Sequence, residues 1–476
     1  MGMFQPSWPV APPPAASRRP QERAASNWAR RRLTRGQRVG LVCLVFLLAI
    51  AAILAPRATI EAAIAICIGL SVAHTALRAL SWAIGQWPQA AHRPIATSDL
   101  PLYSIIVPLY GEANMIGHLV AALGALDYPH DRLDALLAVE HDDEETLTAL
   151  AGAELPQWIR VVVVPPGAPR TKPRACQHAL SHARGVHVVV YDAEDVPDPG
   201  QLRAAVAAFA HHGPATACLQ ASLVPDNRRE NWLTAMFALD YCQWFDGMLA
   251  GFQRLGLPVP LGGSSNHFRT AALRAAGGWD SWNVTEDADL GIRLWRLGHG
   301  VRTLASTTWE EAPLTLDAWL PQRTRWSRGY LQTFLVHARR PVTLGLPGLG
   351  LAGWAFLIVF VGGSIVFALV NPLFWGLATY TLLTGAGAME WAFGPAVAPL
   401  AWASLVFGNA LAMTLTALGP LRRGWWGLSP LALTSPVYWA LVSAASYRAL
   451  YVLAVHPFRW EKTAHGLART RRGQAP

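Results

Sequence analysis

The length, composition and charge of the chain exclude several classes of protein. Of its 476 residues, 52% are hydrophobic and only 14% are charged, a balance that favours a membrane protein over a soluble one. The five cysteines include no CxxC pair, which argues against a zinc site or a disulfide scaffold and fits a reduced cytosolic compartment. The net charge of +9 comes with no nucleic-acid recognition motif, so we expect no nucleic-acid partner.

The N-terminal part of the chain combines a basic arm with two apolar stretches. Residues 1–38 are rich in Pro, Ala and Arg, with eight Arg and one acidic residue, and we expect them to be disordered. Residues 39–87 hold two transmembrane helices, within the stretches 40–55 and 59–85. The arginines place the arm in the cytosol. A cleaved signal peptide is the alternative for the first stretch, but no small-x-small cleavage site precedes a soluble domain.

Residues 100–340 have the composition of a soluble domain. Apolar strand-like runs alternate with helix-like segments; the runs are "YSIIVPLY" (103–110), "DALLAVE" (134–140), "IRVVVVPP" (159–166), "VHVVVYD" (186–192) and "TACLQA" (216–221). This alternation predicts an α/β domain with a mostly parallel, Rossmann-like sheet covered on both faces. Ligands of such sheets bind at the carboxyl ends of the strands.

Residues 345–456 are apolar again, and residues 457–476 form a basic tail. We expect about four transmembrane helices, near 348–370, 372–388, 397–418 and 430–455. An even number keeps the tail in the cytosol, with the soluble domain inserted between two helix blocks of a multi-pass protein of the cytoplasmic membrane. The positions of Arg422 and Arg423 do not fit this topology, because an even number of helices puts their loop outside the cell. The alternative is that this loop lies in the inner interface, anchored by Trp425 and Trp426.

An acidic cluster ends one of the expected strands, in "VVVYDAEDVPDP" (188–199). Asp192 and Glu194 would supply two carboxylate ligands from one turn, and Mg²⁺ or Mn²⁺ prefers such ligands. The alternative is a capping cluster for the helix that begins near Gln201, because acidic residues favour a helix start. Asp198 can cap that helix by itself, which leaves Asp192 and Glu194 unexplained.

Other motifs also follow strand ends or begin helices. They are "VPLYGEANM" (107–115), "EHDDEET" (140–146), "PRTKPRACQHAL" (169–180), "VTEDADLGIRLWRLG" (284–298) and "LPQRTRWSRGY" (320–330). Each has a structural alternative: a capping cluster for the paired aspartates, the first turn of a helix after Thr285, or a solvated helix face. Their order along one chain is the stronger signal.

In that order the motifs "DD", "DAED", "TED" and "QRTRW" make the sequence resemble the membrane-embedded, processive glycosyltransferases of family 2, which include cellulose, hyaluronan and mannan synthases. The resemblance spans about 100–340 and the flanking helices. "YDAEDVPDPGQLR" and "PFRWEKTAHG" look like the bacterial branch that makes surface polysaccharide. The resemblance implies a cytosolic GT-A domain that binds a nucleotide sugar, beside a transmembrane path for the polymer.

The same resemblance implies roles for the residues that bind the donor. Tyr110 and Glu112 would hold the nucleobase, and Asp142 would be the uridine-binding acid, with Asp143 as a neighbour able to substitute for it. Lys172 would face the diphosphate. Asp192 and Glu194 would hold the metal; the family usually has Asp at the second position, so Asp195 is an alternative ligand.

The remaining motifs concern the acceptor. Asp287 would be the general base, and Glu286 would help to orient it. Gln322, Arg325 and Trp326 would lie at the acceptor end, where Trp326 stacks on a sugar ring and Arg325 neutralises the departing diphosphate.

We therefore expect inverting, metal-dependent transfer of a sugar, from a donor expected to be UDP-linked, onto a growing polysaccharide, coupled to export across the bilayer. Export partner proteins are compatible with this function. The nearest alternative is transfer of one sugar to a polyprenyl phosphate or another lipid acceptor. A transporter or receptor that only senses nucleotide sugars is disfavoured, because a sensor needs neither a base nor an acceptor site.

The tail carries Trp460, Lys462 and Thr463 close together, in "HPFRWEKTAHG". One interpretation is a basic tail that binds anionic lipid. The other is a lid that closes over the bound nucleotide, in which Lys462 and Thr463 bind the diphosphate and Trp460 packs on the mouth of the active site.

Overall fold

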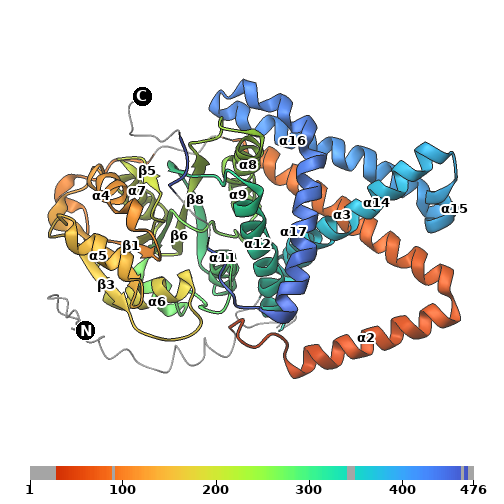
Figure 1. Ribbon diagram of the computed structural model, residues 1–476, viewed down its shortest axis with the longest axis horizontal. Helices are drawn as coiled ribbons and strands as arrows, with labels where there is room; N and C mark the ends of the chain where they lie inside the picture. The colour runs from red at the N-terminus through yellow and green to blue at the C-terminus, as the bar shows by residue number, and fades with distance from the viewer. Residues whose placement is uncertain (1–27, 88–91, 340–348, 463–465, 470–476) are drawn as a thin grey trace.

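The computed structural model describes residues 28–87, 92–339, 349–462 and 466–469. An α/β domain forms one side of the molecule, and long apolar helices extend from it on the other (Figure 1). The expectation of a disordered arm falls mostly on residues 1–27, which lie outside the described residues.

The α/β domain is built on one eight-stranded sheet of order β3-β2-β1-β4-β7-β6-β8-β5. Its strands are β1 (Tyr103–Leu109), β2 (Leu133–Glu140), β3 (Ile159–Val164), β4 (His187–Val190), β5 (Val196–Pro197), β6 (Thr216–Pro225), β7 (Asn266–Arg269) and β8 (Gly300–Glu310). The pairs β3–β2, β2–β1, β1–β4 and β6–β8 are parallel, whereas β7 and β5 pair antiparallel. The mostly parallel sheet is confirmed, and each of the five expected strands is present; the three strands that were not expected are β5, β7 and β8.

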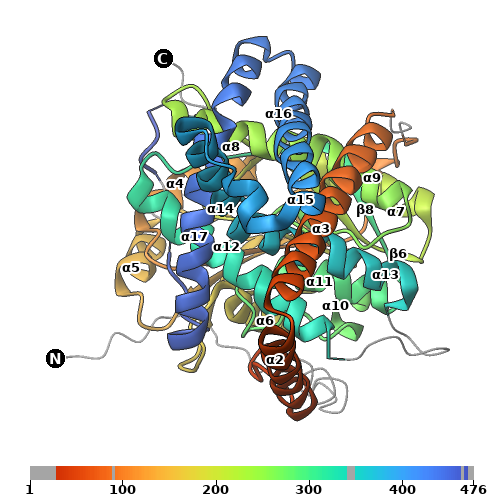
Figure 2. The ribbon, with the colours of Figure 1, turned by 90° about the vertical axis from the view of Figure 1, so that its right-hand side faces the viewer.

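Helices pack on both faces of this sheet, and each face has its own apolar core (Figures 1 and 2). The helices of the domain are α4 (Ile116–Gly124), α5 (Glu144–Gly152), α6 (Lys172–His182), α7 (Gln201–His212), α8 (Trp232–Gln243), α9 (Leu249–Arg254), α10 (Thr270–Ala275), α11 (Glu286–Arg296) and α12 (Leu316–His337). The buried strands are nearly continuous apolar runs because side chains on both of their faces are covered.

The N-terminal helices are α2 (Arg35–Leu54) and α3 (Pro56–Gly85), both long and apolar enough to cross a membrane. A capping box between Thr34 and Gln37 begins α2. The expected disorder up to residue 38 is wrong for residues 28–38, because they dock on the α/β domain: the Ala29 amide donates to Asp280 Oδ2 at 2.6 Å.

Glycines let the end of α3 dock tightly on the α/β domain. A Cβ atom at Gly251 of α9 would lie 1.8 Å from the backbone oxygen of Ser81 in α3. A Cβ atom at Gly85 would lie 1.9 Å from the backbone oxygen of Gly247. The two backbones therefore touch, which fixes the position of α3 relative to the domain.

The C-terminal helices correct the expected count. The described residues after 349 form three long apolar helical segments, not four: Gly350–Thr384, Ala388–Arg423 and Trp426–Val455. They contain α13 (Gly350–Phe356), α14 (Gly363–Thr384), α15 (Ala388–Ala403), α16 (Asn409–Leu418) and α17 (Ser435–Val455). The two spans expected on either side of Asn371-Pro372 are one helix, because α14 continues through Pro372. Neighbouring helices make an internal proline tolerable in such a helix.

Helix α17 lies along α12 of the α/β domain and contacts it, and residues just before α17 contact α8 (Figure 1). Just before α17, Trp232 Nε1 donates to Thr434 Oγ1 at 2.8 Å. Ser327 and Ser446 hydroxyls lie 3.1 Å apart, and after α17 Arg328 Nη1 donates to the carbonyl of His456 at 3.0 Å. Both ends of α17 therefore contact the α/β domain.

The loop that carries Arg422 and Arg423 also contacts the α/β domain. Arg423 forms a two-pronged ion pair with Asp246, with both nitrogen–oxygen distances at 2.6 Å, and Arg422 donates to the Asp246 carbonyl. This agrees with the alternative in which the loop lies on the side of the soluble domain.

Candidate active site

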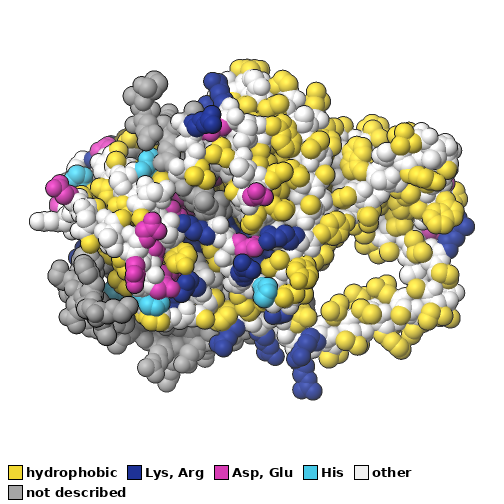
Figure 3. Space-filling model, in the orientation of Figure 1, with side chains coloured by type: hydrophobic (Ala, Val, Ile, Leu, Met, Phe, Trp, Pro, Cys, Tyr) yellow, Lys and Arg dark blue, Asp and Glu magenta, His cyan; other side chains and the backbone are white. Residues whose placement is uncertain are grey.

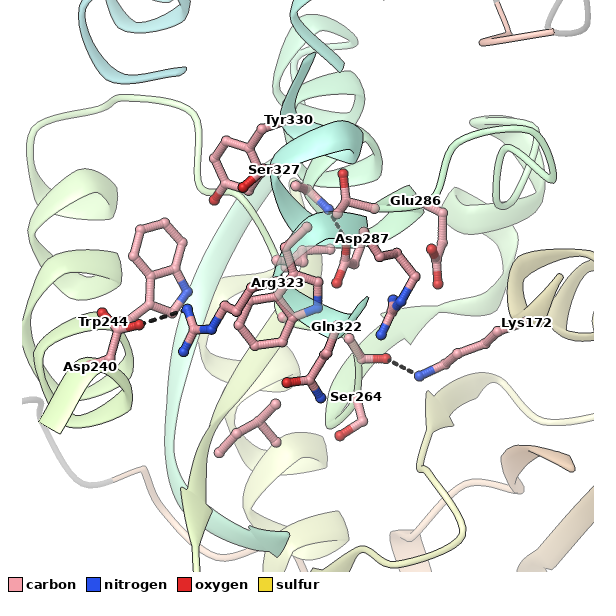
Figure 4. A pocket seen from close by; sticks show the side chains of 18 of the residues that line it. Lys172, Asp240, Trp244, Ser264, Glu286, Asp287, Gln322, Arg323, Ser327 and Tyr330 are labelled. Carbon is pink, nitrogen blue, oxygen red and sulfur yellow. Dashed lines mark hydrogen bonds and ion pairs between the residues drawn. The ribbon is translucent and has the colours of Figure 1, made fainter. Parts of the chain in front are cut away.

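A cavity of about 900 Å³ lies at the carboxyl ends of β1 and β4 and runs on between α12, α14 and α17. Figure 4 shows Lys172 on one side of it, Asp240 and Trp244 on the other, and Glu286 and Asp287 between them. Nearly all of the site residues expected from the sequence line this cavity.

The acidic strand end faces the cavity through Asp192 and Glu194. Burial raises the pKa of Glu194 well above its ordinary value, and the charges of Asp192, Asp195 and Glu112 add to the rise. Asp195 is 1% exposed, and its Oδ2 accepts from the Asp192 amide at 2.9 Å. Asp195 therefore holds the turn, and the two carboxylates that face the cavity are those of Asp192 and Glu194.

Lys172 is the cation nearest to this acidic strand end. It begins α6, and its Nζ lies 2.5 Å from Asp192 Oδ1 and donates to the Gly263 carbonyl at 2.8 Å. Burial opposes the charged form, but Asp192 and Glu286 outweigh it and raise the pKa of Lys172. Lys172 is thus a permanent cation beside the carboxylates.

The donor set fits a hard divalent cation. Two half-buried carboxylates, those of Asp192 and Glu194, face one cavity, and among the described residues no group of three or more potential ligands surrounds a common point. A pair of this kind suits an ion that takes its remaining ligands from a substrate diphosphate and water.

Glu286 and Asp287 occupy the first turn of α11, and both line the cavity. Burial and the neighbouring Asp287 raise the pKa of Glu286 to about 8. Burial also raises the pKa of Asp287, while the Ala288 amide, which donates to Asp287 Oδ1 at 2.7 Å, opposes the rise.

Helix α12 positions the loop before these carboxylates. Gln332 Oε1 accepts from the Val284 amide at 3.1 Å, and Asn283 Nδ2 donates to Thr333 Oγ1 at 3.0 Å. Further along α11, Asp289 Oδ1 lies 3.0 Å from His337 Nε2, and both side chains are buried. The helix that carries "QRTRW" therefore fixes the helix that carries "TED".

Gly263 lies beside the space between the Asp287 carboxylate and the Lys172 ammonium group. A Cβ atom at this position would lie 3.5 Å from Asp287 Oδ2 and 3.7 Å from Lys172 Nζ. A reacting group placed there touches the expected base on one side and a cation on the other.

The "QRTRW" residues line the cavity from α12. Gln322 is 8% exposed and its Oε1 has no hydrogen-bond partner among the described residues, and neither has Nε of Arg325. Trp326 stacks on Tyr241 with ring centroids 6.2 Å apart. Orphaned polar atoms in a cavity are typical of groups that a substrate satisfies.

Only two of the four residues expected to bind the nucleobase line the cavity. Tyr110 and Glu112 line the cavity, whereas Asp142 and Asp143 do not. Asp143 caps α5 through Thr146, and its Oδ2 accepts from the Gly111 amide at 2.5 Å, so the capping alternative describes this residue. Asp142 pairs with Arg170, whose Nη1 donates to the Tyr110 hydroxyl at 3.2 Å.

The tail crosses the mouth of the cavity. Trp460 lies under the guanidinium of Arg325, 4.4 Å from ring centroid to Cζ. Lys462 Nζ lies 3.0 Å from Glu112 Oε1 and donates to the Gly111 carbonyl at 2.6 Å. Thr463, the third residue of the expected lid, lies outside the described residues.

Sequence reasoning missed several polar residues of the cavity wall, among them Arg78, Arg170, Asp240, Gln243 and Glu310. Glu310 ends β8, and the β-branched and aromatic residues in "VRTLASTTWEE" were the signal that would have predicted this strand. Asp240 and Gln243 lie on a largely buried helix, α8, whose apolar sequence gives no such signal.

Comparison with known proteins finds a family match and similar proteins. The model of glycosyl transferase family group 2 matches residues 187–456, more than half of the chain. A β-monoglucosyldiacylglycerol synthase of Synechocystis is 30% identical over 52% of this chain and 52% of its own length. A glucomannan 4-β-mannosyltransferase of Arabidopsis thaliana is 26% identical over 50% of this chain and 46% of its own. The chain thus spans about half the length of these curated relatives.

Among solved structures, a mannosyltransferase of Pyrobaculum calidifontis in complex with GDP-Man and Mn²⁺ is similar at a TM-score of 0.49 and 22% identity. The match covers 82% of this chain and 99% of that one.

Proposed function

Because the chain belongs to glycosyl transferase family group 2 and carries the mostly parallel sheet of a GT-A glycosyltransferase, we propose that it transfers a sugar from a nucleotide-sugar donor to an acceptor hydroxyl with inversion at the anomeric carbon. The observation that carries this proposal is the convergence of Lys172, Asp192, Asp287 and Arg325 on one cavity.

The donor binds at the carboxyl ends of β1 and β4. Tyr110 stacks on the nucleobase beside Arg170, and Glu112 lies next to it. The diphosphate faces Lys172 and Arg325, which offset its charge. We propose a UDP-linked donor, on the resemblance noted in the sequence.

Asp192 and Glu194 would hold Mg²⁺ or Mn²⁺ together with the diphosphate. Bound there, such an ion supplies Lewis-acid stabilisation of charge on the leaving group.

Asp287 accepts the proton of the attacking hydroxyl. The pKa of Glu286 at about 8 keeps that carboxyl largely protonated at neutral pH, which leaves Asp287 as the ionised member of the pair. Environments that push the pKa values of two neighbouring carboxyls upward to different extents assign them different roles.

The step balances without a protein nucleophile. The acceptor oxygen forms a bond to the anomeric carbon as the bond from that carbon to the diphosphate oxygen breaks. The hydroxyl proton goes to Asp287, and the nucleoside diphosphate leaves with the electron pair. Preorganised cations at the leaving group stabilise the charge that develops there.

The sequence leaves two classes of acceptor open. One is a growing polysaccharide that is exported, and the other is a lipid. The relatives above are named for one of each: glucomannan mannosyl transfer and synthesis of a glucosyldiacylglycerol. The shape of the cavity beyond the reacting groups favours the lipid.

We propose that the active site faces the cytosol and that four helical segments cross the membrane. Within the part of the chain that the structure describes, five segments are long and apolar enough. The Trp426–Val455 segment is the exception, because both ends of α17 contact the α/β domain. Four crossings leave the Arg422-Arg423 loop and the tail on the side of that domain, where their ion pairs with Asp246 and Glu112 lie.

A direct test is incubation of the purified protein with several radiolabelled nucleotide sugars and Mn²⁺ or Mg²⁺, with Asp287→Asn as the matched inactive variant. Label transferred to any acceptor by the wild type and not by the variant supports the proposal. If no nucleotide sugar is bound or consumed, the proposal is wrong.

A further inference from the structure

The cavity continues past the reacting groups into a space that we call the inner arm. Its walls are residues of α14 and α17: Ser364, Phe367, Ala368, Leu369, Asn371, Trp439, Val442, Ser443, Ser446 and Leu450. The donor end is lined by carboxylates and cations, whereas most of the inner arm is apolar or aromatic. One continuous cavity therefore changes from a charged end to an apolar end.

The inner arm does not follow the apolar helices across a membrane. Among the residues that the structure describes, none of α2, α15 or α16 lines the cavity, and the lining residues of α14 end at Asn371. None of the residues of α2 is buried. A path for a polar polymer through a bilayer needs protein on all sides, because unsatisfied polar groups are strongly disfavoured in hydrocarbon.

Instead, one wall residue of the arm, on α17, is exposed at the surface. Helices α14 and α17 contact each other where Phe367 and Trp439 have ring centroids 6.3 Å apart and where Tyr447 donates to the Leu369 carbonyl. Leu450, which lines the cavity, is 40% exposed. In Figure 2, α17 lies across the face from which α14 and α15 project. The edge of the arm thus lies between the helix that enters the membrane and one that we place at its surface.

Polar side chains from α3 and α8 line the cavity between its two ends. Arg78 Nη2 donates to Gln243 Oε1 at 2.7 Å, and Asp240 Oδ2 accepts from Arg323 at 2.8 Å. Gln243 is 2% exposed, yet its Nε2 has no hydrogen-bond partner among the described residues. A buried donor without a partner is unfavourable, and a ligand oxygen that accepted from it would remove that cost.

We propose that the inner arm binds a membrane lipid with a free hydroxyl in its head group, and that this lipid is the acceptor. Its hydrocarbon would leave the cavity between α14 and α17, its head group would meet Gln243 and Arg78, and its hydroxyl would reach Asp287. A hydroxyl needs a base, whereas a lipid phosphate is already ionised at neutral pH, so the presence of Asp287 favours a hydroxyl. This inference rests on the proposed transfer function.

The test uses the full-length protein in nanodiscs, with the labelled nucleotide sugar that the protein consumes best. Phosphatidylcholine, which has no head-group hydroxyl, is compared with phosphatidylcholine plus dioleoylglycerol or phosphatidylglycerol. We expect label in the organic phase at least tenfold above phosphatidylcholine alone for one of the two hydroxyl lipids. Label only in a water-soluble product that grows in length, whatever the lipid, would overturn the inference.

Two neighbouring positions of α17 give a matched pair. Ser443 lines the arm and is buried, whereas Ala444 is exposed. Ser443→Trp should reduce lipid-phase label at least tenfold and retain nucleotide-sugar binding, and Ala444→Trp should reduce neither. Asn371→Trp, at the edge of the arm, is a second blocking variant in case Ser443→Trp does not fold. Normal lipid-phase label in a folded blocking variant contradicts the inference, and failure of the wild type to bind any nucleotide sugar contradicts the proposed function itself.

Discussion

Lys462 of the tail and Glu112 of the α/β domain form an ion pair at the mouth of the cavity, 3.0 Å from Nζ to Oε1. Burial raises the pKa of Glu112, and Lys462 opposes that rise. The pair holds the tail over the side of the cavity where the nucleobase is expected, with Trp460 seated on Arg325 beside it. The contact supports the lid interpretation of the tail over simple lipid binding.

Replacing Lys462 should separate these two interpretations. In detergent, without anionic lipid, Lys462→Ala should lower transfer at least tenfold or shift the products towards hydrolysis of the donor, because a lid that closes poorly admits water. Lys462→Arg keeps the charge and should retain most transfer. The measurement is the ratio of transfer to hydrolysis; wild-type values in Lys462→Ala would eliminate the lid.

Replacement of Asp287 tests its role as the general base. Asp287→Asn should lower transfer by about 10²–10⁴-fold, the usual contribution of general acid–base catalysis, and retain donor binding. Product formation and nucleotide-sugar binding would be measured on the same preparation. Normal transfer by the variant would mean that Glu286 or another residue is the general base.

Glu286 should make stability depend on pH. Its pKa is about 8 in the folded protein, against an ordinary 4.5, so the folded state holds a proton that the unfolded state has released between these values. Stability is therefore lost as pH rises through this window, and Glu286→Gln should be more stable than the wild type near pH 8, by on the order of a few kcal/mol. Thermal unfolding at pH 5 and pH 8 measures the gain. The exposed Glu145, changed to Gln, is the control, and a gain that is equal at both pH values would contradict the assignment.

The parts of the fold that could be predicted are those whose signal is local. Strands β1 to β4 are apolar runs between turn residues, and the acidic cluster at Asp192 follows one of them. Strand β7 was missed because Asn266 and His267 are polar; His267 is buried because its Nδ1 pairs with the Tyr103 hydroxyl at 2.8 Å. That partner is remote in sequence, so no local pattern reveals it.

The membrane topology depends on contacts of the same remote kind. By composition, α17 is long and apolar enough to cross a membrane, and our proposal that it does not cross rests on the contacts of both its ends with the α/β domain. Arg78 and Gln243 were missed as site residues because nothing in their own helices marks them. They face a cavity that exists only once α3 has docked on α8 and α9.

That docking depends on Gly251. A methyl group there would lie 1.8 Å from the backbone oxygen of Ser81, and a backbone cannot move aside as a flexible side chain can. Gly251→Ala should therefore destabilise the protein by about 1–3 kcal/mol, measured as a lower midpoint of unfolding in detergent. Gly69→Ala is the matched control, because a Cβ at Gly69 of α3 meets nothing within 4 Å. Equal midpoints for the two variants would show that the helices are not in contact there.

The proposal of four membrane crossings predicts which single cysteines an impermeant thiol reagent can label, when each is introduced into a variant that lacks the five native cysteines. Ala55→Cys, between α2 and α3, and Ala386→Cys, between α14 and α15, should react with an impermeant thiol reagent in intact cells. Trp426→Cys, 70% exposed in the loop before α17, and Arg469→Cys in the tail should react only after lysis. The physical reason is that Arg423 and Lys462 pair with Asp246 and Glu112 of the same domain, so the ends of α17 cannot lie on opposite sides of a bilayer. Labelling of Trp426→Cys in intact cells, with Arg469→Cys protected, would instead make α17 a fifth crossing.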